Sequence, residues 1–537
     1  MHCRPLPFRC LPHQPKLSLD LLYDYSRVSR FYPLPPSLES VTRAANSLDY
    51  PSDRRQSVAN ILREQNAAFG AGKETERNLA RFENAAVAIL TGQQVGLFTG
   101  PAYAIYKALS AIKVAKEVTE AGIDAVPLFW MATEDHDLDE VRHTTFFQDG
   151  ELAHFELPPA PSHGAPVGSI RLGESISELV RAATVMLPGA EGAALAKLLR
   201  EFYRPEESYA GAFGKLFAQI FADYGLILID PLDARVHRIA SPVYVEAIEN
   251  REALNAELLN RDNELEREGY AAQVKVTARS ALLFFTGGGV RQPITANDKK
   301  FRSGEMSWGR DELLARIKAE PEKFSANALL RPVVQDYLFP TVACVVGPAE
   351  VSYFAQSEVL YHGILGRMPA LLPRAGFTIV DPKGQRLLEE YGLQVEDVWK
   401  GPQWVRRHIH SANLPKPIAK QFEKDAKQID KVLDKWASTL TKVDPTLLPA
   451  VETTKKKVAF QVDKLRQKAG HAFDRKTGVL AAHEDFLNNL LYPRKALQSR
   501  DLNFLPFLAR WGFSGLRDLE NHTSIKSLGQ HFIVPIP

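Results

Sequence analysis

Residues 85–117 read AAVAILTGQQVGLFTGPAYAIYKALSAIKVAKE, and this stretch decides the fold class. It begins with a short apolar run that ends at Thr91, and a loop with three glycines follows. From Ala102 to Glu117 the apolar residues recur at three- and four-residue steps, which predicts a helix. Pro101 suits the first helical position, because the N–H that proline lacks is not needed there. The stretch therefore predicts a buried strand, a loop and a helix, in that order.

Further apolar runs predict more buried strands, at residues 125–132 (AVPLFWMA), 226–230 (LILID), 341–346 (TVACVV) and 370–372 (ALL). Continuous apolar strands separated by helices indicate an α/β fold with a parallel sheet that is covered on both faces. The gaps are too long for single crossover helices, so we expect insertions at about 140–220 and 235–325. The second insertion contains QVKVT, ALLFFTGGGVRQPITAND and KFRSGEMSW, which are typical of a small antiparallel meander.

The segment from Lys400 to Arg500 is basic, with 21 Lys and Arg against 10 Asp and Glu, whereas the whole chain carries a net charge of only +2. Two stretches with helical periodicity, 418–440 and 451–480, are separated by Pro445 and Pro449. Their narrow apolar seams are typical of a coiled coil and predict an antiparallel helical hairpin. The lysines of this hairpin form either a solvated outer face or a polyanion-binding arm.

The composition excludes several classes of protein. Apolar residues make up 45% of the chain and charged residues 24%, which are ordinary globular values, so extensive disorder is excluded. The near-neutral charge argues against an overall nucleic-acid binder. No run approaches the roughly 20 apolar residues that a membrane-spanning helix requires, and the start lacks the apolar core of a signal peptide. Three cysteines cannot form a disulfide framework. We therefore expect a cytoplasmic protein without nucleic-acid or membrane partners.

The loop from Thr91 to Pro101 follows the first strand, where ligands bind in open parallel sheets. Its glycines allow close approach of the backbone, and the start of the next helix favours an anion. Gln93 and Gln94 add amide donors and acceptors. The loop matches neither a Walker motif nor GxGxxG. It is thus either a ligand-binding loop or a structural turn.

The segment from Thr133 to Glu140 follows the second strand and reads TEDHDLDE, with five carboxylates and one histidine. Such a group could bind a substrate ammonium, hold a hard cation or supply a general base. The alternative is a capped, solvated helix start, because acidic residues favour helix N-termini. The spacing of His136 and His143 is not typical of zinc, so we expect no metal site.

Two later strands end in residues that suit the same edge of the sheet. Gly347 follows the strand at 341–346, and Arg374 follows the strand at 370–372. The guanidinium of Arg374 could clamp a carboxylate or phosphate, or form a salt bridge to the acidic segment. Cys344 lies inside an apolar strand and is expected to be a buried small side chain rather than a nucleophile.

Four segments make the chain recognisable: TGQQVGLFTGPAYAIYKALSAIKVA, VPLFWMATEDHDLDEV, NALLRPVVQDYLFPTVACVVGPAEVSYFAQ and MPALLPRAGFTIVD. In this order and spacing they resemble the bacillithiol biosynthesis cysteine-adding enzymes (BshC). The resemblance implies a Rossmann-like, nucleotidyltransferase-type core with two connecting insertions, and an α-helical coiled coil that mediates a homodimer. It also implies a ligase that adds L-cysteine to the amine of glucosaminyl malate and forms an amide.

The change in composition near residue 400 and the pattern of predicted strands and helices suggest domain boundaries. We expect an N-terminal helical segment at 1–80 that packs on the core, a Rossmann-like catalytic core at 81–400, a coiled-coil hairpin at 401–495 and a C-terminal return segment at 496–537. Two alternatives stay open, namely a non-catalytic dimeric scaffold with a vestigial nucleotide pocket and a ligase for a related amino-sugar acceptor.

The resemblance does not settle how the carboxylate of cysteine is activated. Class I adenylating enzymes of this fold class begin a helix with HxGH, whereas this chain has Thr99-Gly100-Pro101-Ala102 at the equivalent place, without histidines. Phosphorylation of the carboxylate, or an already activated cysteine donor, therefore stays open beside adenylation. The cofactor is unknown: ATP or another nucleotide and a divalent cation are all candidates.

Roles for individual residues follow from position and resemblance together. Binding of a nucleotide or an acidic substrate is expected for Thr91, Gly92, Gln93, Gln94, Thr99, Gly100 and Tyr103. Asp135, His136 and Asp137 are the expected catalytic residues, which bind the amine and remove its proton, because an attacking nitrogen must be neutral. Arg331 and Arg374 are expected to hold carboxylates of malate or cysteine. Gly347 would let the backbone approach the substrate.

Overall fold

The computed structural model describes the chain except for residues 1–2, 160–163, 298–299, 413–415 and 475–478. It divides into two compact units. The first unit comprises Met1–Gln148, Leu152–Thr378 and Ser499–Val534. The second comprises Asp149–Glu151, Ile379–Gln498 and Pro535–Pro537. The chain thus leaves the first unit and returns to it before its end.

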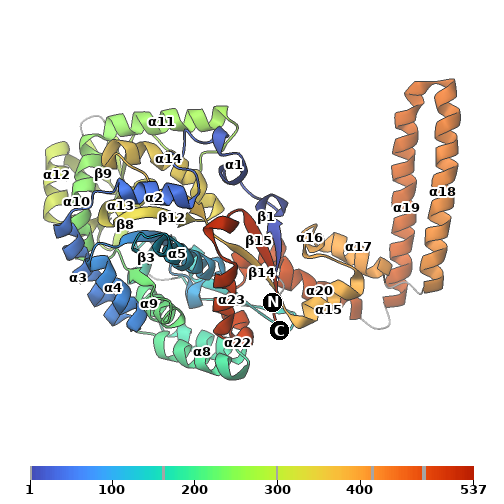
Figure 1. Ribbon diagram of the computed structural model, residues 1–537, viewed down its shortest axis with the longest axis horizontal. Helices are drawn as coiled ribbons and strands as arrows, with labels where there is room; N and C mark the ends of the chain where they lie inside the picture. Colours follow the sequence, from blue (N-terminus) through green and yellow to red (C-terminus); the bar gives the residue numbers. More distant parts are fainter. Residues whose placement is uncertain (1–2, 160–163, 298–299, 413–415, 475–478) are drawn as a thin grey trace. The chain divides into compact units, whose positions relative to one another are not determined.

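The first unit is built on a parallel five-stranded sheet, of which β3 and β12 are labelled in Figure 1. The strand order is β13-β12-β2-β3-β6. Its strands are β2 (Val87–Gln93), β3 (Ala125–Met131), β6 (Ile227–Ile229), β12 (Thr341–Val346) and β13 (Ala370–Pro373). All neighbouring pairs run parallel, and Leu90 of β2 lies opposite Leu128 of β3. The predicted α/β fold with a parallel sheet is confirmed.

Helices cover both faces of this sheet, because alternate residues of its strands are apolar. Val87 and Ile89 of β2 pack with α2 (Leu38–Asn46) and α5 (Tyr103–Glu120) on one face. Ala88 and Leu90 point to the other face. That face is covered mainly by α3 (Ser52–Ala68), α4 (Lys73–Glu83), α10 (Ala234–Glu249), α13 (Arg331–Leu338) and α14 (Pro348–Leu365).

The strand order reverses direction between β2 and β12. From β2 the chain continues through α5 to β3 on one side, and from β12 it continues through α14 to β13 on the other side. At such a switch point the connections leave the carboxyl ends of the strands in opposite directions and open a crevice. The fold therefore places the expected ligand-binding crevice beside the ends of β2 and β12.

The first insertion contains α6 (Leu138–Val141), the strand pair β4 (His143–Gln148) and β5 (Glu151–Glu156), and three helices. These helices are α7 (Ser175–Val185), α8 (Gly189–Phe202) and α9 (Tyr209–Ile220). Phe213 and Phe217 of α9 pack against Phe129 of β3, so the insertion joins the core of the sheet domain.

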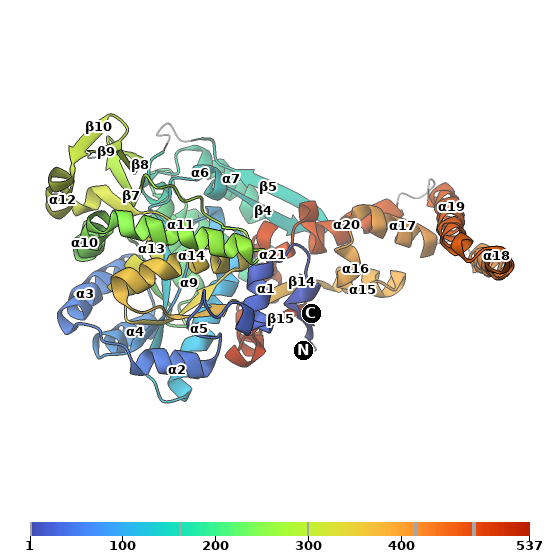
Figure 2. The same cartoon turned by 90° about the horizontal axis from the view of Figure 1, so that it is seen from above.

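The second insertion contains α10, α11 (Arg251–Arg267), α12 (Arg310–Ala319) and an antiparallel sheet with the order β10-β9-β8-β7-β11 (Figure 2). Its strands are β7 (Ser280–Gly287), β8 (Val290–Asn297), β9 (Lys300–Ser303), β10 (Met306–Gly309) and β11 (Phe324–Ala326). The predicted strand QVKVT is wrong, because residues 273–277 belong to no strand. Instead, the backbone N–H groups of Gln273 and Val274 donate to Oε1 of Gln356. A side chain thus takes the place of a neighbouring strand.

The two ends of the chain meet in a further sheet. Strand β1 (Arg4–Pro7) pairs antiparallel with β15 (Gln530–Pro535), with Arg4 opposite Ile533. The three-stranded order is β1-β15-β14, where β14 is Gly376–Val380. The helix α1 (Lys16–Tyr23) follows β1, and the hydroxyl of Tyr23 donates to the carbonyl of Gly529 at 2.6 Å. Residues more than 500 positions apart are therefore neighbours in the first unit.

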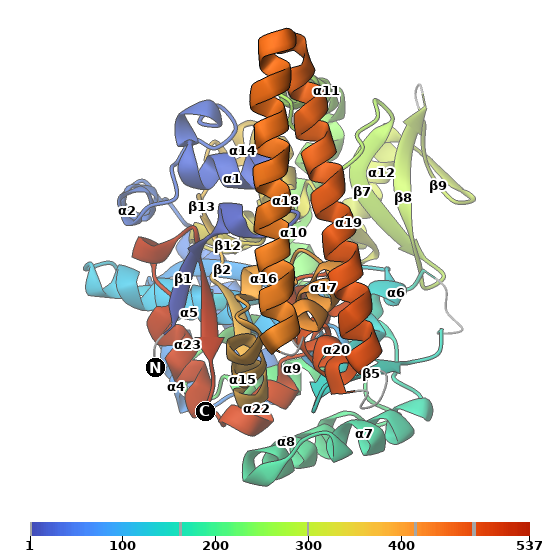
Figure 3. The same cartoon turned by 90° about the vertical axis from the view of Figure 1, so that its right-hand side faces the viewer.

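The second unit contains the helical hairpin formed by α18 (Lys416–Val443) and α19 (Leu448–Asp474) (Figure 3). Leu433 and Val451 are buried, and Lys455 of α19 forms an ion pair with Asp434 of α18. The remaining helices of this unit include α15 (Pro382–Tyr391), α16 (Val395–Val398), α17 (Pro402–Ala412) and α20 (Val479–Leu491). Among the described residues of the whole chain, no helix has the length and apolar character that crossing a membrane requires.

Candidate active site

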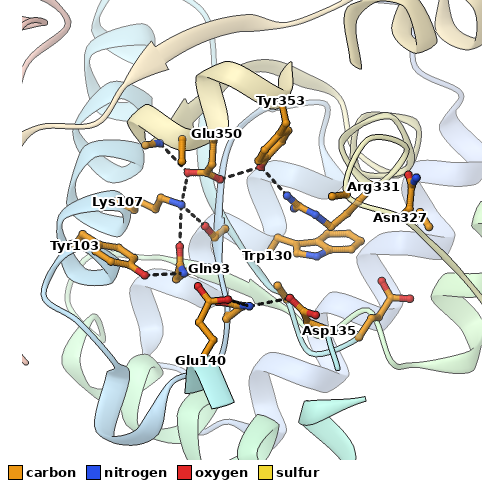
Figure 4. A pocket seen from close by; sticks show the side chains of 18 of the residues that line it. Gln93, Tyr103, Lys107, Trp130, Asp135, Glu140, Asn327, Arg331, Glu350 and Tyr353 are labelled. Atoms are coloured by element: carbon orange, nitrogen blue, oxygen red, sulfur yellow. Dashed lines mark hydrogen bonds and ion pairs between the residues drawn. The ribbon is translucent and has the colours of Figure 1, made fainter. Parts of the chain in front are cut away.

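A cavity of about 440 Å³ lies at the carboxyl ends of the parallel strands, within the first unit. It is bounded by the end of β2, the start of α5, the segment after β3, the antiparallel sheet, and the starts of α13 and α14 (Figure 4). Of the residues expected from the sequence, those that line it are Gly92, Gln93, Gln94, Tyr103, Asp135, His136, Arg331, Gly347 and Arg374. The topology thus brings together residues from four different strand ends.

Lys107 is a buried lysine of α5 that the sequence analysis did not single out. Its ammonium donates to the carbonyl of Gly92 at 2.8 Å and to Oε1 of Gln93 at 2.9 Å, and it forms an ion pair with Glu350 (Figure 4). Burial lowers the pKa of Lys107, and the neighbouring Glu350 opposes this change. The amide of Gln93 also donates to the hydroxyl of Tyr103 at 3.2 Å, so Lys107 fixes the end of β2 against α5.

Glu350, in the first turn of α14, organises the opposite side of the cavity. Its Oε2 accepts the backbone N–H of Gly347 at 2.7 Å. Its Oε1 accepts the hydroxyl of Tyr353 at 3.2 Å, and that hydroxyl accepts a hydrogen bond from Arg331 at 2.8 Å. A continuous chain of interactions therefore runs from Lys107 through Glu350 and Tyr353 to Arg331. The N–H of Gly347, the residue expected to let the backbone approach the substrate, donates to this carboxylate.

Gln94 connects the loop after β2 to the acidic segment after β3. Its amide nitrogen donates to Oδ2 of Asp135 and to Oε2 of Glu140, both at 2.7 Å. Asp135 also accepts the backbone N–H groups of His136 and Asp137 through Oδ1. Burial acts to raise the pKa of Asp135, but these hydrogen bonds outweigh it and lower the pKa below its ordinary value. Asp135 is therefore an ionised, well-ordered carboxylate at neutral pH.

His136 contacts a buried arginine from the antiparallel sheet. Nη1 of Arg291 lies 3.0 Å from Nδ1 of His136. Because a guanidinium only donates hydrogen bonds, Nδ1 of His136 accepts, which leaves the proton of the neutral ring on Nε2. Arg291 is held by Ser325 and by the carbonyl of Ala326, both at 2.8 Å. The second insertion therefore supplies one wall of the cavity.

Four of the expected site residues do not line the cavity, namely Thr91, Thr99, Gly100 and Asp137. Asp137 caps α6 by accepting the backbone N–H of Glu140, which is the alternative interpretation of the acidic segment. The hydroxyl of Thr91 donates to the carbonyl of Val345 at 2.9 Å and so joins β2 to β12. Thr99 and Gly100 have φ angles of 81° and 68° and lie in the tight turn before α5. These residues shape the loop rather than face a ligand.

Arg374 and Arg500 add two guanidinium groups to one part of the cavity wall. Arg374 is 9% exposed, and its Nη1 donates to the carbonyl of Ala375. Burial and repulsion from the neighbouring Arg500 lower the pKa of Arg374 to about 10. In the part of the chain that the structure describes, no Asp or Glu oxygen forms an ion pair with either guanidinium, so the alternative salt bridge to the acidic segment is absent. The pair suits an anionic group, either a carboxylate or a phosphate.

Two buried polar atoms in the cavity wall have no hydrogen-bond partner among the described residues: Oε1 of Glu134 and Nε1 of Trp130. Burial raises the pKa of Glu134 to about 7. Such unpaired buried groups are uncommon in folded proteins, and they require an explanation such as an ordered water or a catalytic role. The described residues contain no cluster of three His, Cys, Asp or Glu side chains that could hold a metal ion.

Six cavity residues were not predicted from the sequence, namely Lys107, Glu134, Arg291, Glu350, Tyr353 and Arg500. Lys107 and Arg291 lie in a helix and a strand whose patterns read as ordinary secondary structure. Glu350 and Tyr353 were visible as the polar residues after Gly347, one helical turn apart, and that spacing was the available signal. Arg500 comes from the return segment, whose place in the first unit depends on tertiary structure.

Two family models match the chain. The N-terminal Rossmann-like domain of bacillithiol biosynthesis BshC matches residues 1–375, and the C-terminal coiled-coil domain of BshC matches residues 377–535. A protein of Koribacter versatilis named "Putative cysteine ligase BshC" is 40% identical over 508 residues, covering 94% of this chain and 95% of its own length.

Further relatives carry the same name. The protein of Solibacter usitatus is 34% identical, over 95% of this chain and 96% of its own length. The protein of Salinibacter ruber is 31% identical, over 94% of both chains. The resemblance seen in the sequence is thereby confirmed, and relatives named as cysteine ligases support a ligase role. The matched domains, the fold and the similarity along the whole chain show that this protein belongs to the BshC family of bacillithiol biosynthesis.

Proposed function

We propose that this protein is an amide-forming ligase that joins the carboxyl group of L-cysteine to the amine of glucosaminyl malate. The observation that carries the proposal is the charge distribution of the cavity. Unpaired guanidinium groups and an unpaired carboxyl group line the same space, which suits substrates that bear both anionic and amine groups. The names of the relatives supply the substrate class, L-cysteine.

Arg374 and Arg500 are suited to bind the carboxylates of the acidic acceptor. Malate brings two carboxylates, and each guanidinium can bind a carboxylate through two parallel hydrogen bonds. In this proposal Arg374 and Arg500 hold the malate part of the acceptor. Arg331, which is fixed by Tyr353, holds the carboxyl group of cysteine. The preorganised hydrogen bond leaves the guanidinium of Arg331 little freedom to lose on binding.

The acidic side of the cavity is suited to bind the amine of the acceptor. Asp135 is ionised and held by three hydrogen bonds, so it can accept a hydrogen bond from a substrate ammonium without moving. His136 presents its ring beside it. In this proposal Asp135 and His136 bind and orient the amine. The opposite charges at the two sides of the cavity fix one orientation of the acceptor.

Activation of the cysteine carboxyl requires a further reactant, because an unactivated carboxylate is a poor acceptor for a nucleophile. The loop residues Gly92, Gln93 and Gln94 reach the cavity and are the candidates for contact with a nucleotide. Lys107 and Tyr103 hold Gln93 in place and thereby position this loop. A nucleoside triphosphate and an already activated cysteine donor are the two reactant classes to compare.

Product analysis tests the proposal. The purified protein is incubated with L-cysteine and glucosaminyl malate, with and without a nucleoside triphosphate and Mg²⁺, and low-molecular-weight thiols are measured by mass spectrometry. We expect a product whose mass is the sum of both substrates less one water. Absence of this product under every condition, from protein that binds neither substrate in thermal-shift measurements, would favour the scaffold alternative.

We also propose that the hairpin of α18 and α19 forms a homodimer. Several large apolar side chains of this hairpin are exposed, namely Val432, Trp436, Leu440, Phe460 and Leu465. Trp436 is 56% exposed and Leu465 is 60% exposed, although both belong to the apolar seam of a coiled coil. Exposed apolar seams of this kind are normally covered by another helix. A second copy of the chain would supply it.

A further inference from the structure

Glu134 is a buried carboxyl group at the cavity wall whose setting differs from that of every other acidic residue in the segment after β3. It is 9% exposed, whereas Asp137 and Glu140 reach the surface. Its Oε1 is fully buried and has no hydrogen-bond partner among the described residues, and Nε2 of His237 lies 3.7 Å from it. Glu134 is therefore a carboxyl group held inside the cavity wall without a neutralising contact.

His237 does not supply the missing charge. This residue lies on α10, and burial lowers its pKa to about 4, so its ring is neutral at physiological pH. Its Nδ1 lies 3.3 Å from the hydroxyl of Tyr244. The packing around His237 therefore gives Glu134 a polar but uncharged neighbour.

The charged and titratable groups that act on Glu134 come from every element packed around it. They are Arg291 of β8, Arg331 of α13, Asp230 after β6, His237 and Tyr244 of α10, and Asp135 of the same segment. The two arginines favour the ionised carboxylate, whereas burial, Asp230 and Asp135 oppose ionisation. Burial dominates, so the carboxyl group changes its protonation state near neutral pH.

The other candidates for a proton acceptor are already engaged. Three donated hydrogen bonds stabilise the ionised form of Asp135, which makes it a weak base. Nδ1 of His136 accepts a hydrogen bond from Arg291, so its lone pair is occupied. Asp137 lies outside the cavity and caps α6. Glu140 lines the cavity but is exposed, and its Oε2 accepts the amide N–H of Gln94. Glu134 differs from these residues because it lines the cavity and none of the described hydrogen bonds reaches its carboxyl group.

We propose that Glu134 accepts the proton of the substrate ammonium, so that the amine is neutral when it attacks the activated cysteine carboxyl. This inference rests on the proposed ligase function and names a catalytic residue for it. The step is a proton transfer: the N–H bond of the ammonium breaks, its electron pair stays on nitrogen as the nucleophilic lone pair, and an O–H bond forms on Glu134. Charge is conserved, because an ammonium and a carboxylate become an amine and a carboxylic acid.

Trp130 also contributes to this wall, but its indole N–H is fully buried and donates to no described residue. Asp135 orients the ammonium, and Glu134 takes its proton. This division of roles uses one strongly ionised carboxylate and one whose environment raises its basicity.

The experiment compares Glu134→Gln and Glu134→Asp with Asp336→Asn as the matched control. Asp336 is a buried carboxyl group of the same unit, it lies outside the cavity, and burial raises its pKa to about 6. Each variant is first checked for a thermal midpoint that shows a folded protein. Product formation is then measured from pH 5.5 to pH 9.5, with glucosaminyl malate at subsaturating concentration.

We expect Glu134→Gln to reduce the rate at least ~100-fold at pH 7, the scale of a lost general base. Its rate should rise about tenfold per pH unit as the fraction of free amine grows, and should approach the wild-type rate at high pH. Glu134→Asp should lose less, because it retains a base. Asp336→Asn should keep the wild-type pH profile. Equal profiles for Glu134→Gln and the wild type would overturn the inference while leaving the ligase function intact.

A binding measurement separates failure of this inference from failure of the proposed function. Titration calorimetry with glucosaminyl malate near pH 7, in two buffers of different ionisation enthalpy, counts the protons released on binding. The wild type should release a fraction of a proton, because the ammonium favours ionised Glu134, and Glu134→Gln should release none. Identical proton release by both proteins would refute the role of Glu134. If the wild type neither binds glucosaminyl malate nor forms product, the ligase proposal fails, and this inference fails with it.

Discussion

Lys107 and Glu350 form an ion pair that connects α5, the helix after β2, to α14, the helix after β12. The side chain of Lys107 is 4% exposed and that of Glu350 is 20% exposed. The pair therefore lies where the two halves of the parallel sheet diverge. It holds Gln93 and Gly347 at the edges of the crevice through the hydrogen bonds that each partner also makes.

Removing one partner of this pair should destabilise the first unit. Lys107→Met leaves the carboxylate of Glu350 partly buried without a cation, and loss of one partner of a buried pair typically costs about 3–5 kcal/mol. Because Glu350 is partly exposed, we expect a loss in the free energy of unfolding near the lower end of this range. Lys107→Met combined with Glu350→Gln should cost less than the sum of the single changes. Urea unfolding of the wild type, the two single variants and the double variant measures this coupling. If the two changes are strictly additive, the ion pair contributes no coupling free energy.

Arg374 should govern the affinity for the acidic acceptor. Arg374→Gln removes a guanidinium that has no carboxylate partner in the described structure, so the protein loses little stability while a bound anion loses charge-assisted hydrogen bonds. Such bonds contribute about 1.5–3 kcal/mol, which corresponds to roughly 10- to 100-fold weaker binding. The exposed residue Arg267 offers a matched control, Arg267→Gln. Calorimetric titration with glucosaminyl malate gives the result, and equal affinities of both variants would remove Arg374 from the binding site.

The assembly prediction concerns the exposed seam of the hairpin. Trp436→Glu together with Leu465→Glu places charges on side chains that are more than half exposed, so the hairpin itself should remain folded. We expect monomers in sedimentation equilibrium at concentrations where the wild type is dimeric. Leu433 is unsuitable for this test, because it is buried within the hairpin and an acidic replacement would disrupt the helices. A dimer that persists in the double variant would place the dimer contact elsewhere.

The three cysteines should be dispensable for catalysis. Burial raises the pKa of the Cys344 thiol well above its ordinary value, so it stays protonated inside β12. Burial likewise raises the pKa of Cys3. Neither residue lines the cavity, nor does Cys10. A variant with Cys3→Ser, Cys10→Ser and Cys344→Ala should form product at a near-normal rate and lose on the order of 1–2 kcal/mol of stability from the small cavity. A folded but inactive triple variant would indicate a thiol-bound intermediate.

Glu134 should also leave a signature in the pH dependence of stability. Its folded-state pKa, raised to about 7, exceeds the ordinary value of a glutamate, so the protonated form is favoured in the folded state. The stabilisation from this group is complete below the unfolded-state pKa and is lost as the pH rises through 7. Glu134→Gln mimics the protonated form. As the pH rises from 5 to 8, the free energy of unfolding of the variant should therefore increase by about 1–3 kcal/mol relative to that of the wild type. Denaturant unfolding at each pH measures this difference. If the difference in free energy of unfolding between the variant and the wild type stays constant from pH 5 to pH 8, the raised pKa of Glu134 is contradicted.

The sequence predicted the parallel sheet well, because each buried strand is a continuous apolar run with a loop after it. The failure at residues 273–277 has a clear cause: an alternating pattern indicates a strand only if a neighbouring strand is available, and here Gln356 supplies the hydrogen bonds instead. The cavity was harder to predict in detail. Gln93 and Asp135 were found because they follow strand ends. Lys107 and Arg291 became visible only with the sheet order and the fold of the second insertion.

The acidic segment shows why residue type alone does not assign a role. Glu134, Asp135 and Asp137 are close in sequence, yet one is buried without a partner, one is fixed by three hydrogen bonds and one caps a helix. The direction in which the chain turns after β3 decides which side chain faces the interior. That direction depends on contacts such as the hydrogen bond from the backbone N–H of Gly168 to the carbonyl of Thr133, which come from the first insertion. Sequence periodicity carries no information about such contacts.

The pairing of β1 with β15 has a consequence for synthesis on the ribosome. Residues 499–534 belong to the first unit, although residues 379–498 of the second unit precede them in the chain. The side chain of Asn503 donates to the carbonyls of Phe98 and Gly100. The turn before α5 therefore gains these hydrogen bonds only after residue 503 has been synthesised. The helical hairpin contains mostly local contacts and can form as soon as it emerges, whereas the sheet domain closes only after residues 499–534 have been made. During most of translation the cavity would therefore lack Arg500 and the contacts that residues 499–534 make with the sheet domain. We expect chaperones to bind the incomplete sheet domain during this time.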